Sequence, residues 1–217
     1  MSDFDFLGKE KLYIEYFRKG SDAYADKVKF FEDHKNELHF LDPAQWNEIQ
    51  IDFVLCLFQI GRYERYLEEV DCVIELVIRE NIYFFEGKNI FNYLLRKKAS
   101  CFINLKQHKK ALPIIEQLIR LDKDDPNHAY IYELTMRKES MKNEEVVKGT
   151  AIIALIAGLS LKFAETFVID PFFEDYLNTF STFTLGLFII GASLLVSNEI
   201  YRRLTIKYKL NKIKNSQ

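Results

Sequence analysis

Residues 54–73 read VLCLFQIGRYERYLEEVDCV, and residues 99–118 read ASCFINLKQHKKALPIIEQL. The two stretches align without gaps, and small or apolar side chains recur at helical spacing on both sides of a central break. This arrangement predicts two helices joined by a turn in each stretch. The matched positions are Val54, Leu57, Gly61, Tyr63, Tyr66, Val70 and Val73 in the first stretch and Ala99, Phe102, Lys106, His108, Ala111, Ile115 and Leu118 in the second.

This pattern resembles the tetratricopeptide repeat (TPR), a helix–turn–helix unit with a small residue, an aromatic, a turn glycine, a tyrosine and an alanine at these spacings. The second copy continues into IRLDKDDP, which is similar to the family's exit, with Pro126 at the second of its two proline positions. Tyr66 departs from the pattern, because alanine is usual there, and the copies lie 45 residues apart rather than about 34. The resemblance implies stacked helix pairs and a groove that binds a partner protein or peptide. The alternative is a generic helical bundle.

The rest of the first 145 residues also has helical character. Residues 7–40 carry apolar side chains at helical spacing and would form a degenerate first repeat, and Asp42 followed by Pro43 predicts a new helix start. The extra length between the copies falls in residues 79–95, which predicts longer helices or a longer loop. The chain has only eight glycines and four prolines, and no segment alternates with period two. We therefore predict an all-α, TPR-like helical repeat (α-solenoid) domain over residues 1–145.

Two long apolar runs follow, at residues 146–169 and 177–196. A helix needs about 20 apolar residues to cross a bilayer. We therefore predict two transmembrane helices within residues 146–200, joined by a short acidic outer turn at 170–176 and followed by a basic tail at 201–217. Pro171 would end the first helix, and Phe172, Phe173 and Tyr176 would lie at the outer interface. The alternative is a buried apolar hairpin in a larger soluble fold.

The distribution of charge predicts the orientation of these helices. Residues 1–145 hold 27 acidic and 22 basic side chains, whereas residues 146–217 hold five acidic and eight basic ones. Positive flanks stay in the cytoplasm, so both termini should be cytoplasmic, and we expect a bacterial inner membrane. The three cysteines, Cys56, Cys72 and Cys101, have no paired spacing, which is typical of reduced cytosolic thiols.

The basic tail is expected to contact anionic lipids. Ile206, Leu210 and Ile213 alternate with its basic residues and predict the apolar face of a helix lying on the membrane. The basic side chains are Arg202, Arg203, Lys207, Lys209, Lys212 and Lys214, preceded on the first flank by Lys142 and Lys148.

Lys162 and Glu165 lie inside the first apolar run, where charge is unfavourable. One interpretation is a pair near the outer leaflet, with the lysine stem reaching toward water. The other is a homo-oligomer in which both side chains face a shared polar interior or pore. Pairs of small residues at spacing four, Ala154 with Gly158 and Thr182 with Gly186, would let such spans pack closely.

No motif of known chemistry appears, so we predict a protein without catalytic, cofactor-binding or metal sites. His34, His39, His108 and His128 have no metal-ligand spacing, the acidic cluster at residues 122–125 reads as a solvated turn, and no phosphate-binding glycine loop is present. We do not expect a nucleic acid partner. The sequence instead favours a membrane-anchored adaptor that binds a partner protein. The alternative is a small oligomerising membrane effector, of the bacterial defence or toxin type, whose hairpin permeabilises the inner membrane.

Overall fold

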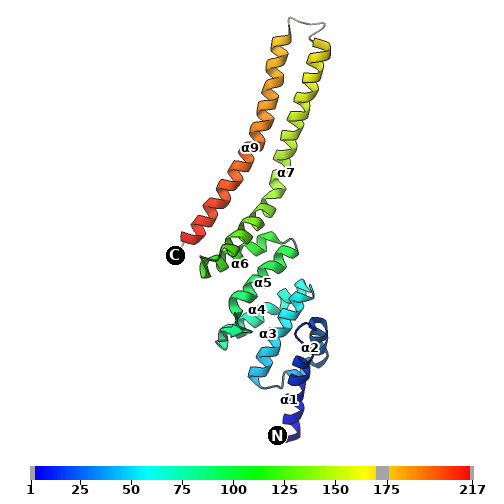
Figure 1. The fold of residues 1–217 in the computed structure, drawn as a ribbon, viewed down its shortest axis with the longest axis vertical. Helices are drawn as coiled ribbons and strands as arrows, with labels where there is room; N and C mark the ends of the chain where they lie inside the picture. Colours follow the sequence, from blue (N-terminus) through cyan, green and yellow to red (C-terminus); the bar gives the residue numbers. More distant parts are fainter. Residues whose placement is uncertain (1–2, 170–175, 216–217) are drawn as a thin grey trace. The chain divides into compact units, whose positions relative to one another are not determined.

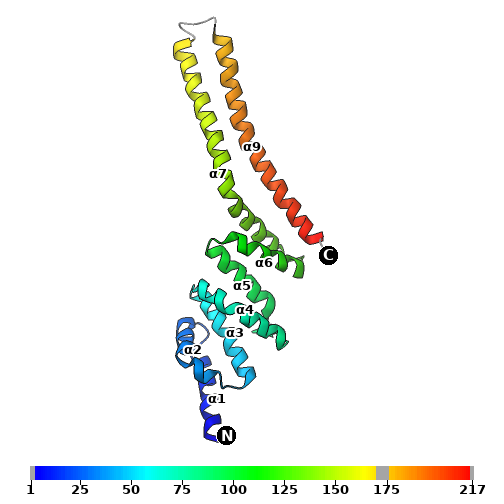
Figure 2. The same ribbon diagram turned by 180° about the vertical axis from the view of Figure 1, so that it is seen from behind.

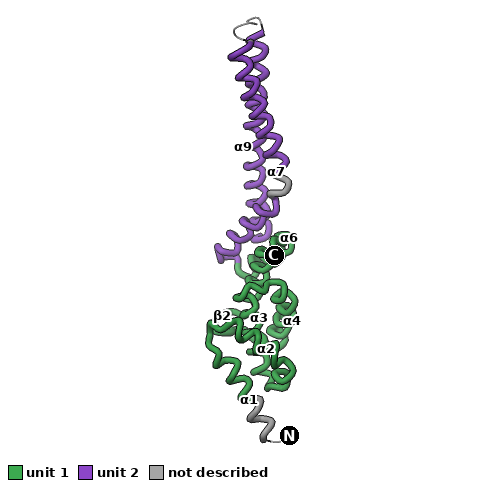
Figure 3. The backbone as a smooth tube through the Cα atoms, turned by 90° about the vertical axis from the view of Figure 1, so that its right-hand side faces the viewer, with its two compact units in different colours: residues 1–122 green, residues 123–217 purple. Residues whose placement is uncertain are grey.

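The computed structural model describes the backbone of residues 3–169 and 176–215 and the side chains of residues 10–140, 145–168 and 176–215. Within this part the chain is almost entirely helical, as the spacing of its apolar residues predicts. It divides into two compact units, Met1–Asp122 and Lys123–Gln217 (Figure 3). Of the predicted interfacial residues at the outer turn, only Tyr176, which is exposed, belongs to the described part.

The first unit is a stack of helices in which each helix packs on the next (Figure 1). Besides neighbouring α2 and α4, α3 also contacts α1 and α5, so alternate helices lie against one another as well. This is the consecutive packing that a repeat-like pattern predicts. The helices are α1 (Asp3–Arg18), α2 (Tyr24–Leu38), α3 (Pro43–Gln59), α4 (Tyr63–Arg79), α5 (Ile90–Asn104) and α6 (His108–Leu121).

The turns inside the two helix pairs have the same geometry. Gly61 and Lys106, which the alignment matches, both have positive φ, at +76° and +58°. The residue after each of them forms the same backbone hydrogen bond. The Arg62 N–H donates to the Leu57 carbonyl (3.0 Å), and the Gln107 N–H donates to the Phe102 carbonyl (2.8 Å). This bond satisfies a carbonyl that the helix end would leave without a partner. Glycine adopts positive φ readily, whereas lysine rarely does, so Lys106 is the strained residue of the two.

The ends of α3 and α5 follow local capping rules. The Asp42 side chain accepts from the Ala44 N–H at 3.1 Å, and Pro43 occupies the first turn of α3, as the sequence predicts. In α5, the Asn89 side chain accepts from the Asn92 N–H at 3.1 Å.

The extra length between the two copies forms a small β-hairpin rather than a helix extension. Strands β1 (Phe84–Phe85) and β2 (Lys88–Asn89) pair antiparallel between α4 and α5. The two turn residues, Glu86 and Gly87, have φ of +47° and +74°. Positive φ at both central positions is the geometry that suits a two-residue hairpin, and glycine adopts it without strain. The pairing is too short to be predicted from alternation of apolar residues.

The second unit is a hairpin of two long helices that run side by side (Figures 1 and 2). α7 (Pro126–Ala164) continues into a π-helical turn, η1 (Glu165–Ile169), and α9 (Leu177–Asn215) returns along it. α7 and α9 have 39 residues each and are therefore about 58 Å long. Since a bilayer core is about 30 Å thick, each helix is longer than one span. The second compact unit, Lys123–Gln217, begins before the predicted domain boundary at residue 145 and includes the residues of the predicted tail.

Small side chains let the two helices of the hairpin approach closely. A Cβ added at Gly191 would lie 2.9 Å from the Leu155 side chain, and one at Gly158 would lie 3.3 Å from Phe188. Ala151 and Thr184 are buried one heptad from these glycines. Of the predicted small pairs, Gly158 does lie at this contact, but Gly186 has open space around it and Thr182 is exposed. The contact between α7 and α9 of one chain therefore includes Gly158 and neither member of the second pair, and packing of these pairs between chains stays a prediction.

The structure corrects the prediction that the apolar residues of the tail face a membrane surface. Ile206 and Ile213 are buried, and Leu210 is half-buried. They belong to α9, which packs on α7. The apolar face is therefore covered within the chain and does not require a lipid surface.

Candidate functional site

The residues matched between the two repeat-like segments form the packing core of their helix pairs. Phe102, Tyr63 and His108 are half-buried, and Gly61 stands at the turn. Pro126 opens α7, where the Asp125 side chain caps the helix by accepting from the Asn127 N–H at 2.8 Å. These positions stabilise the stack rather than face a ligand. The fully buried ones are Val54, Leu57, Tyr66, Val70, Val73, Ala99, Ala111, Ile115 and Leu118.

Tyr66 has a structural role that explains its departure from the repeat pattern. Its hydroxyl donates to the Leu94 carbonyl at 3.0 Å and so joins α4 to α5. Burial raises the pKa of Tyr66 far above its ordinary value. Ala111 occupies the matching position of the second copy and is also buried. The two matched positions are therefore both buried, one filled by a small residue and the other by a hydrogen-bonded aromatic.

A buried polar cluster, which sequence reasoning missed, joins the first three helices. Asp52 of α3 accepts from the Tyr16 hydroxyl of α1 at 2.8 Å and pairs with the Lys27 ammonium of α2 at 3.0 Å. The Cys56 thiol lies 3.6 Å from the same carboxylate oxygen. All four side chains are buried. The available signal was the single charge inside the apolar stretch IQIDFVLCLF, since a buried carboxylate requires partners.

The chemistry of this cluster is structural. Desolvation by burial, together with the Asp52 charge, raises the pKa of Cys56 to about 12, so the thiol stays protonated at neutral pH. Burial and the same carboxylate raise the pKa of Tyr16 far above its ordinary value. Neither group is a nucleophile near neutral pH. The cluster instead fixes α1, α2 and α3 relative to one another through one shared acceptor.

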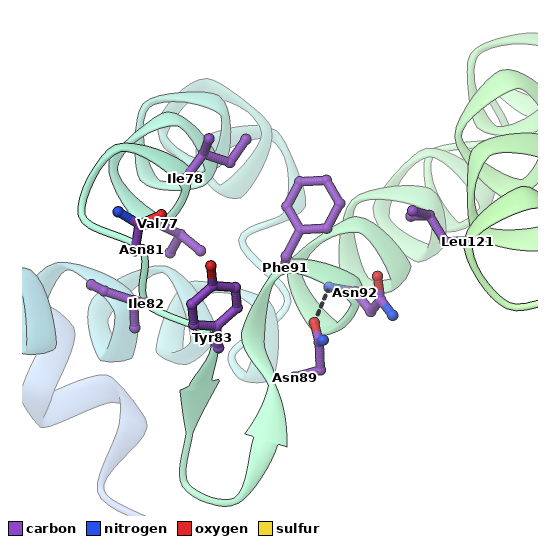
Figure 4. A pocket seen from close by; sticks show the side chains of 9 residues that line it. All are labelled: Val77, Ile78, Asn81, Ile82, Tyr83, Asn89, Phe91, Asn92 and Leu121. Carbon is purple, nitrogen blue, oxygen red and sulfur yellow. Dashed lines mark hydrogen bonds between the residues drawn. The ribbon is translucent and has the colours of Figure 1, made fainter.

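The first unit has a surface hollow of about 500 Å³ where α4 ends and α5 begins (Figure 4). Figure 4 shows the side chains of α4 and of the following connection gathered on one side of Phe91, with Leu121 of α6 on the other. Ile78, Tyr83 and Leu121 are largely exposed although they are large and apolar. Exposed apolar side chains around a hollow are typical of a protein-binding surface. The lining residues are Val77, Ile78, Asn81, Ile82, Tyr83, Asn89, Phe91, Asn92 and Leu121.

Three asparagines place amide groups among these apolar side chains. The Asn89 side chain is already engaged with the backbone N–H of Asn92. Asn81 ends the α4 region with φ of +53°, a conformation that asparagine tolerates. The hollow can therefore offer side-chain hydrogen bonds as well as apolar contact to an extended segment or helix. Charged side chains are absent from its described lining.

The second unit has two helical segments that are long and apolar enough to cross a membrane, one at Glu145–Val168 and one within α9. Large apolar side chains project from both of them away from the helix–helix contact. Exposed examples are Ile153, Ile156, Leu159, Phe163, Phe167, Phe183, Leu185, Ile189 and Ile190. Large exposed apolar patches mark surfaces that contact another protein or a membrane.

Lys162 and Glu165 form an ion pair at 2.7 Å within this apolar segment. The two side chains differ in exposure: Lys162 is 53% exposed, whereas Glu165 is 6% exposed. The second carboxylate oxygen of Glu165, Oε2, is buried and has no hydrogen-bond partner among the described residues. Glu165 is also the first residue of the π-helical turn, a feature that often accompanies functional sites.

The predicted basic residues divide into a paired group and an exposed group. Arg202 and Arg203 both bond the Glu199 carboxylate. Lys207, Lys209 and Lys212 are exposed, and Lys214 is half-buried. The side chain of Lys142 lies outside the described part, and Lys148 is exposed.

The described residues contain no group of three or more His, Cys, Asp or Glu side chains that could hold a metal ion. His128 is buried, with Nε2 3.4 Å from the Asp125 carboxylate. His108 is half-buried, with Nδ1 shielded from solvent. These histidines belong to helix starts, where packing explains their positions.

Comparison with protein-family models, curated proteins and solved structures finds no match to this chain.

Proposed function

We propose that the chain is a membrane-anchored adaptor. In this proposal the hairpin crosses the membrane twice, both termini face the cytoplasm of a bacterial cell, and the first unit binds a partner protein. The observation that carries the proposal is the row of exposed apolar side chains along the candidate spans, which lipid would cover. The TPR resemblance supports the binding role, because helical repeats commonly bind peptides and helices.

The partner is expected to contact the hollow at the end of α4. Its apolar lining and uncharged amides favour an apolar, weakly charged segment over a strongly charged one. Binding there would bury Tyr83 and Ile78, which are now exposed. Anchoring would hold this surface close to the membrane and raise the effective concentration of a membrane-associated partner.

Membrane insertion is tested by alkaline extraction of membranes that contain the full chain. An inserted hairpin stays in the pellet, and a protease added from the periplasmic side leaves both termini intact. Release of the chain into the soluble fraction would refute the anchor. Partner binding is tested by a photo-crosslinking residue at Tyr83, with one at the exposed Ile14 as the matched control. An adaptor gives a discrete adduct from Tyr83 that Ile78→Asp abolishes, and none from Ile14.

A membrane effector is the second candidate, and one observation favours it. Among the described residues, the buried Oε2 of Glu165 has no hydrogen-bond partner, which is costly in a lipid environment unless another polar group or water reaches it. An effector should depolarise the cells that express it, and Lys162→Met or Glu165→Gln should abolish the effect. An adaptor should leave the membrane potential intact in all three chains.

A further inference from the structure

The last turns of α9 have a second apolar side, which remains exposed in the hairpin. Ile200, Leu204 and Tyr208 lie on it and are called the outer ridge below; Leu204 and Tyr208 are 62% and 70% exposed. Both are two residues from the buried Ile206, which corresponds to about 200° around a helix, so they lie on the side opposite the one that Ile206 buries. The ridge residues recur every four positions, and rows with this spacing are the ridges with which one helix packs on another. The outer ridge therefore suits a helix as the group that covers it.

The outer ridge continues past the apolar run that would cross a membrane. This run ends at Val196, so Leu204 lies about 12 Å and Tyr208 about 18 Å farther along the helix. The headgroup layer on each side of a bilayer core is only about 5–8 Å thick. If the hairpin crosses a bilayer as proposed above, these two side chains are in water on the side of the termini. Another protein, rather than lipid, is then the group that covers them.

Basic side chains border the outer ridge. Residues 201–217 contain six lysines and arginines and no Asp or Glu. Lys207 and Lys212 are exposed, and the helical rotation places them on opposite sides of the ridge. An apolar ridge between two lysines is complementary to a helix that has an apolar face with acidic borders. A second copy of the chain is disfavoured as the occupant, because it would bring the same lysines to the contact.

We infer that the outer ridge binds an acidic amphipathic helix of a partner protein on the side of the membrane that carries the termini. The apolar face of the partner helix packs on Leu204 and Tyr208, and its carboxylates pair with Lys207 and Lys212. The choice of protein over lipid rests on the proposed membrane insertion. The surface itself belongs to the second unit, whereas the hollow at the end of α4 belongs to the first, so the two binding proposals fail independently.

The test is binding of a synthetic helical peptide to the full chain in nanodiscs of phosphatidylcholine, measured by fluorescence anisotropy. The peptide has leucine along one face and glutamate on both borders of that face. One control peptide has lysine in place of glutamate, and a second has the same residues in an order that gives no apolar face. The chain should bind the acidic helix at least about tenfold more tightly than either control, and empty nanodiscs should not bind it.

Two variants of the chain locate the contact. Leu204→Gln should weaken binding of the acidic helix about tenfold, because it removes a central apolar side chain. Ile14→Gln, at an exposed apolar residue of the first unit, is the control and should leave binding within about twofold. Reversing both charges, with Lys207→Glu and Lys212→Glu, should transfer the preference to the lysine peptide. The charge reversal also carries the test if Leu204→Gln does not accumulate.

Equal binding by the wild type, Leu204→Gln and the charge-reversed chain would overturn the site. If Ile78→Asp weakens binding and Leu204→Gln does not, the peptide occupies the hollow of the first unit and the outer ridge is not the site.

Two other occupants give results of their own. If phosphatidylglycerol in the nanodiscs abolishes peptide binding, anionic lipid covers the outer ridge, and if the chain alone forms a dimer that Leu204→Gln dissociates, a second copy covers it. Either result would refute the partner helix. If the chain is released by alkaline extraction yet still binds the peptide, the proposed anchor fails while the outer ridge stands as a binding surface.

Discussion

The two compact units are both helical but differ in the exposure of their large apolar side chains. In the first unit, Leu57, Tyr66 and Leu94 are fully buried among neighbouring helices. In the second, Ile153, Leu159 and Phe163 project from a two-helix hairpin that is too thin to cover them. Burial of apolar surface stabilises the first unit in water. In the second unit these side chains stay exposed in the hairpin itself, and the contact between its two helices depends on small side chains.

The largest effect is expected from breaking the buried ion pair of the first unit. Asp52→Ala leaves Lys27 buried without its carboxylate, so the free energy of unfolding should fall by about 3–5 kcal/mol. Urea denaturation of the chain in detergent, followed by the fluorescence of its one tryptophan, Trp46, measures this change.

Glu37→Ala, at an exposed position of α2, is the control and should change stability by no more than about 0.5 kcal/mol. Replacing both partners, as in Lys27→Met with Asp52→Leu, should recover most of the loss, because no charge is then left buried. An Asp52→Ala chain that unfolds at the wild-type midpoint would show that the cluster does not stabilise the stack.

The corresponding change in the hairpin is expected to have a smaller effect. Gly191→Leu would place a Cβ 2.9 Å from Leu155 and 3.2 Å from the Ala151 carbonyl, so the helices must move apart. Overpacking of this kind costs about 1–3 kcal/mol. Gly186→Leu is the matched control, because nothing lies within 4 Å of its Cβ position.

The measurement is a pulsed EPR distance between spin labels at the exposed Ile156 and Ile189, in a chain where the exposed Cys72 is serine. The distance should lengthen with Gly191→Leu and stay unchanged with Gly186→Leu. A longer distance in both variants would mean that the observed packing face of α9 is wrong.

Removing one hydrogen bond in the first unit should cost less again. Tyr66→Phe keeps the ring in place but deprives the Leu94 carbonyl of its donor, which should lower the free energy of unfolding by about 1 kcal/mol. Tyr63→Phe, at a half-buried tyrosine in the same helix, provides the comparison and should cost less. Equal losses in the two variants would assign no special role to the Tyr66 hydroxyl.

The next prediction concerns the three thiols, because their chemical labelling reports burial without altering the fold. Cys72 is exposed, whereas Cys56 and Cys101 are buried, and burial raises the pKa of both to about 12. At pH 8 iodoacetamide should therefore label the native chain once, at Cys72, and urea should expose the other two. Rapid labelling of Cys56 in the native chain would contradict the packing of α1 to α3.

The same raised pKa values predict a loss of stability at high pH. A thiol with an ordinary pKa of about 9 when unfolded and about 12 when folded contributes its full stability below pH 9. This contribution decreases as the pH rises from 9 to 12, because the unfolded chain ionises first. Cys56→Ala should reduce that slope, as measured by urea denaturation at several pH values.

Much of the architecture could be predicted from local signals. Helical periodicity identified the helices, Asp42 with Pro43 marked the start of α3, and the alignment of Gly61 with Lys106 matches two turns of the same geometry. The β-hairpin was missed because two-residue strands are too short for alternation to be visible. The buried Tyr16–Lys27–Asp52 cluster was missed because its members come from three helices, and only their packing brings them together.

The sequence by itself determined the helical class of this protein, its apolar runs and the positions where helices begin and turn. These depend on interactions within about one helical turn or on composition along one segment. Only the tertiary structure decided which face of each helix is covered. It placed Gly191 rather than Gly186 at the helix contact, and it buried Ile206 and Ile213 within the hairpin. The physical reason is that packing depends on shape complementarity between segments far apart in sequence, which periodicity in either segment does not specify.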